Sequence, residues 1–143
     1  MAESPVTELS PEESWDLLRS HELGRLAFHL ADEVHLVPVN YAVDTRHRIV
    51  FRSNEGSKLL GLKMDSDVAF EIDEVGDEEA HSVVVRGRAR ALEGDEADEA
   101  EELPVRPWVA EEKYRVVVID VDEISGRRFR LHRPWLHLRD PDG

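Results

Sequence analysis

The sequence lacks cysteine and long apolar runs. Without cysteine, the chain has no disulfide framework, no thiolate nucleophile and no cysteine-ligated zinc or iron–sulfur site. No segment approaches the about 18 apolar residues that a membrane span needs. The opening MAESPVTELS has neither the basic start nor the apolar run of a signal peptide. We therefore expect a soluble, cytoplasmic protein with no membrane partner.

Positive charge is also scarce. The 18 lysines and arginines are outnumbered by 32 aspartates and glutamates, which gives a formal net charge of −14. Such a field repels a polyphosphate backbone, so we expect no nucleic-acid partner. The acidic run 93–102, EGDEADEAEE, is interpreted as an exposed helix or loop. Arginines gather in a C-terminal tail at about 127–143, where we expect them to meet an anion on this chain, on a partner subunit or on a ligand.

One helix is predicted near the N-terminus, at about 10–22. Ser10 is a suitable N-cap, Pro11 suits the first helical position, and Glu13 is placed to complete a capping box. Gly24 is interpreted as the residue that ends this helix. We expect the helix to pack on a sheet and to carry no chemistry.

Runs rich in valine, isoleucine and phenylalanine predict strands over the rest of the chain. Six such runs occur, at residues 24–30, 33–44, 47–53, 67–73, 81–92 and 114–126. The first two connections are short enough for hairpins, so the sheet is expected to be mostly antiparallel. Two helical interruptions are expected, at about 56–63 and 95–103. At 143 residues, this pattern predicts a single, mainly β domain, a six-stranded β-barrel with accessory helices.

The predicted strand at 81–92 places small and apolar residues on one face and arginines on the other. Val85, Gly87 and Ala89 alternate with Arg86, Arg88 and Arg90. The small side chains allow a crossing strand or a flat ligand to approach closely. For the arginines, we favour ion pairs with the acidic run at 69–74 over ligand binding.

The segment IVFRSNEGSKLLGL is the first candidate for a binding site. The strand ends by projecting Arg52 and Ser53 toward a turn that opens a helix, and unpaired N–H groups at a helix start bind phosphate. Gly56 and Ser57 allow close approach, and Lys58 adds a full charge. The pattern is not a P-loop, because the required earlier glycine is missing. An ordinary capped surface helix explains the same residues equally well.

The preceding strand, HLVPVNYAVD, is the second candidate. A proline within a strand restricts it to an edge or a bulge, which leaves neighbouring main-chain groups available to a ligand. Residues 37–41 would offer such groups, with the Asn40 side chain, beside an apolar surface suited to a planar heteroaromatic ring. A barrel bulge with no ligand is the alternative.

The order of VPVNYAVD, IVFRSNEGSKLLGL, DVAFEIDE, SVVVRGRA and RPW resembles the pyridoxamine 5'-phosphate oxidase-like family of FMN-binding split barrels, in particular its small bacterial and archaeal members. The resemblance covers roughly residues 17–125. It implies a six-stranded antiparallel FMN-binding split barrel that forms a homodimer, with two FMN molecules held between the subunits.

The resemblance also implies roles for particular residues. The flavin phosphate would be held by Arg52, Ser53, Ser57 and Lys58. The isoalloxazine ring would be lined by Pro38, Val39 and Asn40. The flavin of the partner subunit would be reached by Trp108 and Arg106. The chain lacks the long C-terminal substrate-binding segment of the true pyridoxamine phosphate oxidases, so we do not expect vitamin B6 oxidation.

No nucleophile with a paired base is evident, and none of the seven histidines forms a metal-ligand pattern. We therefore predict no metal and leave the catalytic residues unassigned. The favoured hypothesis is an FMN-dependent oxidoreductase acting on a small organic substrate. A reductase that uses the deazaflavin coenzyme is one alternative. A non-catalytic flavin-binding dimer, or a dimer without cofactor, is the other.

Overall fold

The computed structural model describes residues 4–54, 66–101, 103 and 114–135. The predicted helix at 56–63 lies outside these residues, as do Ser57, Lys58, Arg106 and Trp108. The elements are β1 (Val6–Leu9), α1 (Pro11–Ser20), β2 (Leu23–Leu30), β3 (Glu33–Val43), β4 (Ile49–Asn54), β5 (Ser66–Val75), β6 (Glu79–Ala91), α2 (Asp95–Ala100) and β7 (Tyr114–Arg130). All six predicted strands are present, as β2 to β7, and β1 was not predicted.

The N-terminal helix begins as predicted. The Ser10 Oγ accepts a hydrogen bond from the Glu13 N–H at 3.1 Å, and the Glu13 carboxylate accepts one from the Ser10 N–H at 3.1 Å, which completes the capping box. The predicted end was wrong, because α1 stops at Ser20 and Gly24 lies within β2. A Cβ at Gly24 would stand 2.2 Å from the Phe70 ring, so this glycine makes room for a core side chain.

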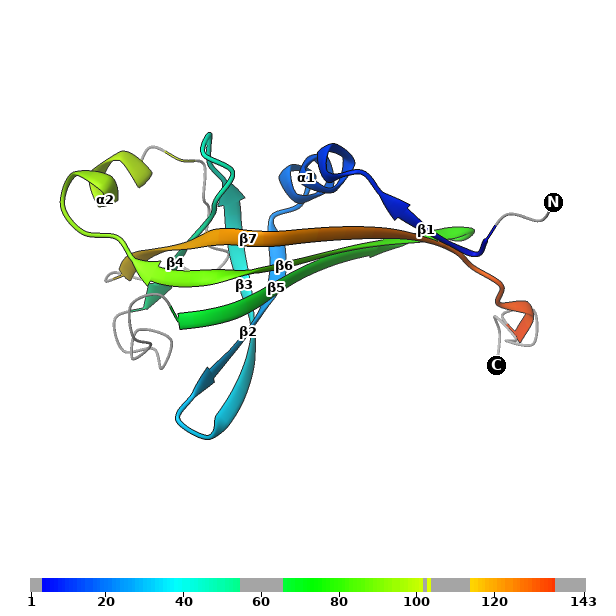
Figure 1. Cartoon of the computed structure of the whole chain (residues 1–143), viewed down its shortest axis with the longest axis horizontal. Coiled ribbons are helices and arrows are strands. Elements are labelled where there is room, and N and C mark those ends of the chain that lie inside the picture. Colours follow the sequence, from blue (N-terminus) through cyan, green and yellow to red (C-terminus); the bar gives the residue numbers. More distant parts are fainter. Residues whose placement is uncertain (1–3, 55–65, 102, 104–113, 136–143) are drawn as a thin grey trace, which may run out of the picture.

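The strands form a closed barrel. Neighbours follow the order β7-β4-β3-β2-β5-β6, every pair is antiparallel, and β6 pairs again with β7. The predicted six-stranded antiparallel barrel is thus confirmed, with β1 added at the edge of β7. The first part of β6 and the last part of β7, which pair from Arg86–Glu123 to Glu79–Arg130, extend beyond the barrel as a long arm. We call it the β6–β7 arm. β1 lies beside it and α1 lies over one of its faces (Figure 1).

The barrel interior is filled by large apolar side chains, with α1 closing one side. Leu18 of α1 is fully buried, and the Tyr41 hydroxyl donates to its carbonyl oxygen at 2.6 Å. Burial raises the pKa of Tyr41 far above its ordinary value, so the phenol stays neutral. A second apolar cluster lies under α2 and contains Val50, Leu92, Ala100, Val116 and Val118.

The predicted faces of β6 are confirmed. Val85, Gly87 and Ala89 are buried, whereas Arg86 and Arg88 are exposed. A Cβ at Gly87 would stand 2.1 Å from the Asp120 carbonyl oxygen, so the backbone that approaches this glycine closely is that of the neighbouring strand β7. A register shift between Arg86 and Gly87 marks a β-bulge at this point of the β6–β7 pairing.

The C-terminal arginines differ from the expected tail. β7 extends to Arg130, so the first three of these arginines lie in a strand. The Arg133 guanidinium donates to the carbonyl oxygens of Gly76 at 2.9 Å and Asp77 at 3.1 Å, in the β5–β6 turn. Neither described helix is long and apolar enough to span a membrane.

Candidate functional site

Both sequence-derived candidates lie where β3 and β4 stop pairing with each other. The described ladder between these strands has its last pair at Tyr41 and Phe51. Beyond it, β3 continues against β2, with Asn40 opposite Leu23, while β4 continues against β7, with Asn54 opposite Tyr114. The register therefore brings residues 38–40 and 52–54 to the two margins of one opening. We call it the β3–β4 opening.

Arg52 is held firmly at one margin of this opening. Its side chain is only 18% exposed, and its guanidinium carbon lies 4.5 Å from the centre of the Tyr114 ring. The Nη2 group also donates to the Glu101 Oε2 at 3.3 Å. Because the arginine is stacked and bonded, its charge is oriented in advance, which favours binding of an anion.

Glu101 and Tyr114 were missed by the sequence reasoning. The Tyr114 hydroxyl donates to the same Glu101 Oε2 at 2.6 Å, and this bond raises the pKa of Tyr114. The acidic run that contains Glu101 was interpreted as solvated, and nothing in its pattern marks one glutamate as the partner of Arg52. This carboxylate would compete with a phosphate for the guanidinium.

Arg52 and Ser53 do not converge on one face of β4. Successive side chains of a strand point to opposite sides. Ser53 is 6% exposed on the side of Phe51, in the barrel interior, whereas Arg52 lies on the side of Tyr114. Arg52 and Ser53 could therefore hold the same phosphate only if it lay at the end of β4, where both side chains could reach it. That role stays a prediction.

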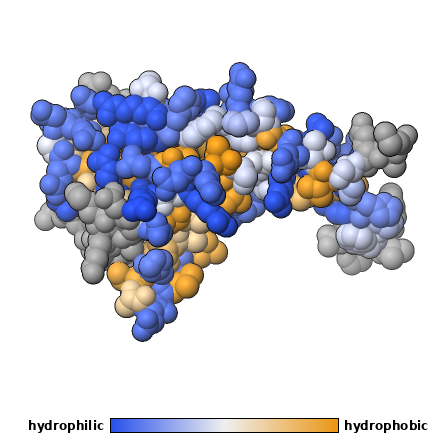
Figure 2. Space-filling view, in the orientation of Figure 1, coloured by the Kyte–Doolittle hydropathy of each residue, from blue (hydrophilic) through white to orange (hydrophobic). Residues whose placement is uncertain are grey.

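The other margin combines polar and apolar groups. Pro38 is exposed, Val39 is half-buried against the main core, and the Asn40 side-chain amide donates to the Glu22 carbonyl oxygen at 3.4 Å. Val34 and Leu36 share the outward face of β3 with Pro38 and are 81% and 67% exposed. Figure 2 shows hydrophobic residues gathered over the β2–β3 hairpin at the bottom of the view.

A shallow pocket lies next to these apolar side chains. It has a volume of about 430 Å³ and is lined mainly by residues of β2, β5 and β6, with one residue each from β3 and β7. Its lining residues are Ala27, Phe28, His29, Val34, Asp67, Val68, Ala69, Arg86, Gly87 and Asp122. An apolar surface with a few polar groups at its rim is typical of sites for flat organic ligands. The described residues contain no group of three histidine, aspartate or glutamate side chains that could hold a metal ion.

Comparison with known proteins places this architecture in a family. Residues 10–128 match the profile of the family described as pyridoxamine 5'-phosphate oxidase. The chain belongs to the pyridoxamine 5'-phosphate oxidase family. A crystal structure from Corynebacterium glutamicum is 40% identical, with a TM-score of 0.84, and the match covers 92% of this chain and 98% of that one. The predicted split-barrel fold and the predicted resemblance are both confirmed.

Two further relatives of this pyridoxamine 5'-phosphate oxidase family member come from mycobacteria. A Mycobacterium smegmatis structure named as an FAD binding protein is 37% identical, with a TM-score of 0.79, and the match covers 88% of this chain and 100% of that one. An uncharacterized protein of Mycobacterium tuberculosis is 40% identical over 84 residues, which are 58% of this chain and 76% of the relative.

Proposed function

We propose that this chain is a flavin-binding protein that uses FMN as an oxidoreductase cofactor for a small organic substrate. The observation that carries the proposal is the β3–β4 opening, where a stacked arginine and an exposed apolar strand face occupy opposite margins. The similarity to the FAD binding protein of Mycobacterium smegmatis supports a flavin as the ligand class.

The phosphate end of the flavin is assigned to the end of β4. Arg52 would supply a forked charge-assisted contact, for which its planar group is well suited. Ser53, Ser57 and Lys58 are the further phosphate ligands that the sequence predicts. The charge of Arg52 is already partly balanced by Glu101 at 3.3 Å, so binding would exchange one anionic partner for another.

The ring of the flavin is assigned to the margin formed by β3. Pro38, Val39 and Asn40 would present main-chain groups and a side-chain amide, and Leu36 extends the apolar surface. A planar ring laid there would exclude water from an exposed hydrophobic face. When bound, the flavin supplies hydride transfer, and the protein contributes position and electrostatics.

The protein is also proposed to act as a homodimer in the cytoplasm. Val34 and Leu36 form an apolar surface that a second copy would cover. Arg106 and Trp108 would then reach the flavin of the partner subunit, as the family resemblance implies. A flavin at the β3–β4 opening would lie close to such an interface.

FAD is the second candidate cofactor, because a relative with 37% identity is named for binding it. The two flavins share the isoalloxazine ring, so a visible spectrum alone does not separate them. Mass spectrometry of the molecule released by denaturation does. A deazaflavin coenzyme would be recognised by its different mass and absorption.

The proposal is tested by purifying the protein and titrating FMN against it. We expect absorption in the flavin bands, or quenching of added FMN fluorescence. Arg52→Gln should weaken binding by about 1.5–3 kcal/mol, the range for a hydrogen bond to a charged group. Arg19→Gln is the matched control, because Arg19 is an exposed arginine of α1 that pairs with Asp16 at 3.4 Å and has no assigned contact with the flavin.

Two outcomes would count against the proposal. A colourless protein that leaves FMN and FAD fluorescence unchanged would remove the flavin function. Equal FMN affinity in wild type and Arg52→Gln would remove Arg52 from the site and leave the flavin to be placed elsewhere.

A further inference from the structure

The outer face of the β6–β7 arm carries a groove far from the β3–β4 opening. The β6–β7 groove has a volume of about 600 Å³. Its lining residues are Ser82, Val84, Arg86, Glu123, Ile124, Ser125, Arg127 and Phe129. Along β7, Arg127 stands about 35 Å of extended strand from Val116, the residue opposite Arg52. One small ligand on this chain cannot bridge both places.

Three cross-strand pairs form the floor of the groove. Arg86 is opposite Glu123, Val84 is opposite Ser125, and Ser82 is opposite Arg127. Directly opposed residues of an antiparallel pair share one face of the sheet. The two arginines therefore stand about 13 Å apart along the arm, within reach of a ligand between them.

The opposite face of the arm is already covered. A Cβ at Gly126 would stand 2.3 Å from the Ser14 Oγ of α1 and 3.1 Å from Leu9, so α1 and β1 pack tightly there. The groove face has no such cover among the described residues, and Figure 1 shows α1 on one side of the arm alone. Its polar side chains are thus available to a ligand.

Arg86 and Arg127 lack the ion pairs that other arginines of this acidic protein make. Arg88 pairs with Asp67 at 3.8 Å and Asp122 at 3.9 Å, and Arg90 pairs with Asp120 at 2.7 Å. Among the described residues, neither Arg86 nor Arg127 forms an ion pair, although Glu123 is opposite the first in register and Glu8 of β1 is opposite the second.

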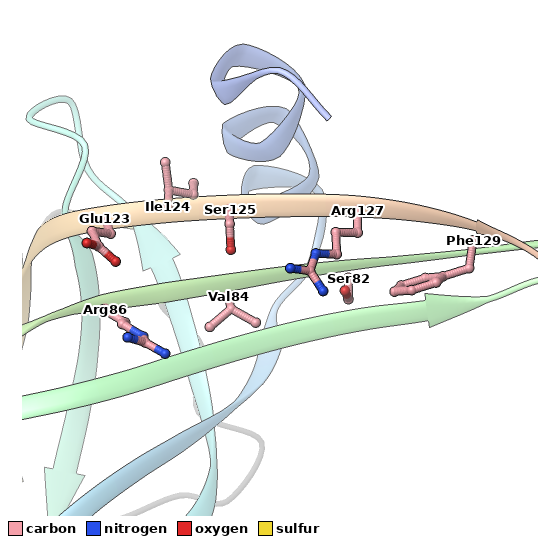
Figure 3. Close-up of a pocket in the computed structure, with 8 residues that line it drawn as sticks. All are labelled: Ser82, Val84, Arg86, Glu123, Ile124, Ser125, Arg127 and Phe129. Atoms are coloured by element: carbon pink, nitrogen blue, oxygen red, sulfur yellow. The ribbon is translucent and has the colours of Figure 1, made fainter. Parts of the chain in front are cut away.

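The two side chains instead turn toward each other. Figure 3 shows the guanidinium groups of Arg86 and Arg127 leaning inward along the groove, on either side of Val84. An anion placed between two positive groups is attracted by both of them. Val84 provides an apolar surface between the two groups, whereas Phe129 lies beyond Arg127 (Figure 3).

We propose that the β6–β7 groove binds a small organic anion whose carboxylate or phosphate accepts hydrogen bonds from Arg86 and Arg127 and whose apolar body lies on Val84. Planar guanidinium groups suit both kinds of oxyanion. Ser82 and Ser125 add hydroxyl groups that donate to the remaining oxygens. The site does not depend on the proposed flavin site.

The test is an NMR titration of the purified protein that follows the arginine Nε–H signals. The probes are phenyl phosphate, benzoate and inorganic phosphate. Phenyl phosphate and benzoate differ in their anionic group, and phenyl phosphate differs from inorganic phosphate by its ring. Phenyl phosphate or benzoate should shift the Arg86 and Arg127 signals and bind more tightly than inorganic phosphate.

Substitution then assigns the contacts. Arg86→Gln and Arg127→Gln should each raise the dissociation constant of the better aromatic probe by about tenfold or more. Arg88→Gln is the matched control, because Arg88 is on the same face of β6 but outside the groove, and it should bind as wild type does. FMN affinity should be the same in wild type and Arg127→Gln, because Arg127 lines the groove alone, whereas Arg86 also lines the 430 Å³ pocket near β3.

The proposal is overturned if saturating aromatic probes leave both arginine signals unmoved, as would happen if a second copy of the chain closed the groove. It is equally overturned if Arg88→Gln loses as much affinity as the two groove variants. Circular dichroism and thermal unfolding confirm that each variant is folded. A loss of FMN binding with probe binding intact would count against the flavin proposal alone.

Discussion

At the scale of single residues, the contact between Arg52 and Glu101 decides how readily the β3–β4 opening accepts an anion. Arg52 is oriented by the Tyr114 ring, but Glu101 shares its charge at a distance of 3.3 Å. An exposed ion pair of this kind contributes about 0–1 kcal/mol. An anion that displaced Glu101 from Arg52 would therefore do so at a small energetic cost.

Glu101→Gln should therefore tighten FMN binding. Removal of the competing carboxylate leaves the stacked guanidinium available, and we expect an increase in affinity of about two- to fivefold, in keeping with a partly exposed pair. Fluorescence quenching measures the change. The pKa of Tyr114 should also fall toward its ordinary value, because its hydrogen bond to Glu101 is the main cause of the upward shift.

Glu99→Gln is the control for this substitution, since Glu99 is an exposed acid of α2, two residues before Glu101. It removes one negative charge without touching Arg52. If both variants tighten FMN binding equally, the effect comes from the net charge of the protein. If Glu101→Gln weakens binding, Glu101 holds Arg52 in position and does not compete with phosphate.

At the scale of elements, the alternation of apolar and polar residues predicted more of the structure than the composition of the segments did. The faces of β6 followed directly from VVVRGRARA, because buried and exposed positions of a strand alternate. The capping box of α1 was equally readable, since both of its partners lie within four residues. Patterns whose partners are close in sequence are the ones that can be predicted.

Features that depend on distant residues were missed. Gly24 was taken for a helix end, although its true partner is the ring of Phe70, 46 residues away. β1 is short and exposed, and only the edge of β7 makes it a strand. The candidate site was half predicted for the same reason, because Arg52 was readable from its motif while Tyr114 and Glu101 were not.

Gly87 provides a test of how closely β6 and β7 must approach. In Gly87→Ala the new methyl group would meet the Asp120 carbonyl oxygen at 2.1 Å and the Ile119 Cγ2 at 3.0 Å, so the backbone of β7 must shift. Overpacking of this kind costs about 1–3 kcal/mol. Chemical denaturation should show a lower free energy of unfolding by that amount.

Gly76→Ala is the control, because its Cβ would meet only the Glu79 carbonyl oxygen, at 3.2 Å, in the β5–β6 turn. We expect a smaller loss of stability than in Gly87→Ala. Equal stability of wild type and Gly87→Ala would show that the β-bulge beside Gly87 absorbs the methyl group.

At the scale of the whole molecule, the distribution of exposed apolar residues favours self-association. Val34 and Leu36 lie together on β3, next to the pocket that crosses β2, β5 and β6. A surface of this kind is usually covered by a partner or a ligand. The net charge of −14 opposes non-specific aggregation, so a specific dimer is the expected form.

Leu36→Glu should convert a dimer into a monomer. The substitution places a charge at the centre of the exposed β3 surface, where burial against a second copy would leave it without a counter-ion. Light scattering at micromolar concentration should give the mass of two chains for wild type and of one chain for the variant. Weaker FMN binding should accompany the change, if the partner subunit contributes to the flavin site.

Val75→Glu is the matched control, because Val75 is 66% exposed against 67% for Leu36 and lies at the far end of β5. It introduces the same charge on the same kind of exposed strand residue and should leave the dimer intact. A wild-type protein with the mass of one chain would contradict the dimer outright. Dissociation by both variants would mean that added negative charge, and not the β3 surface, controls association, because the chain already carries an excess of acid.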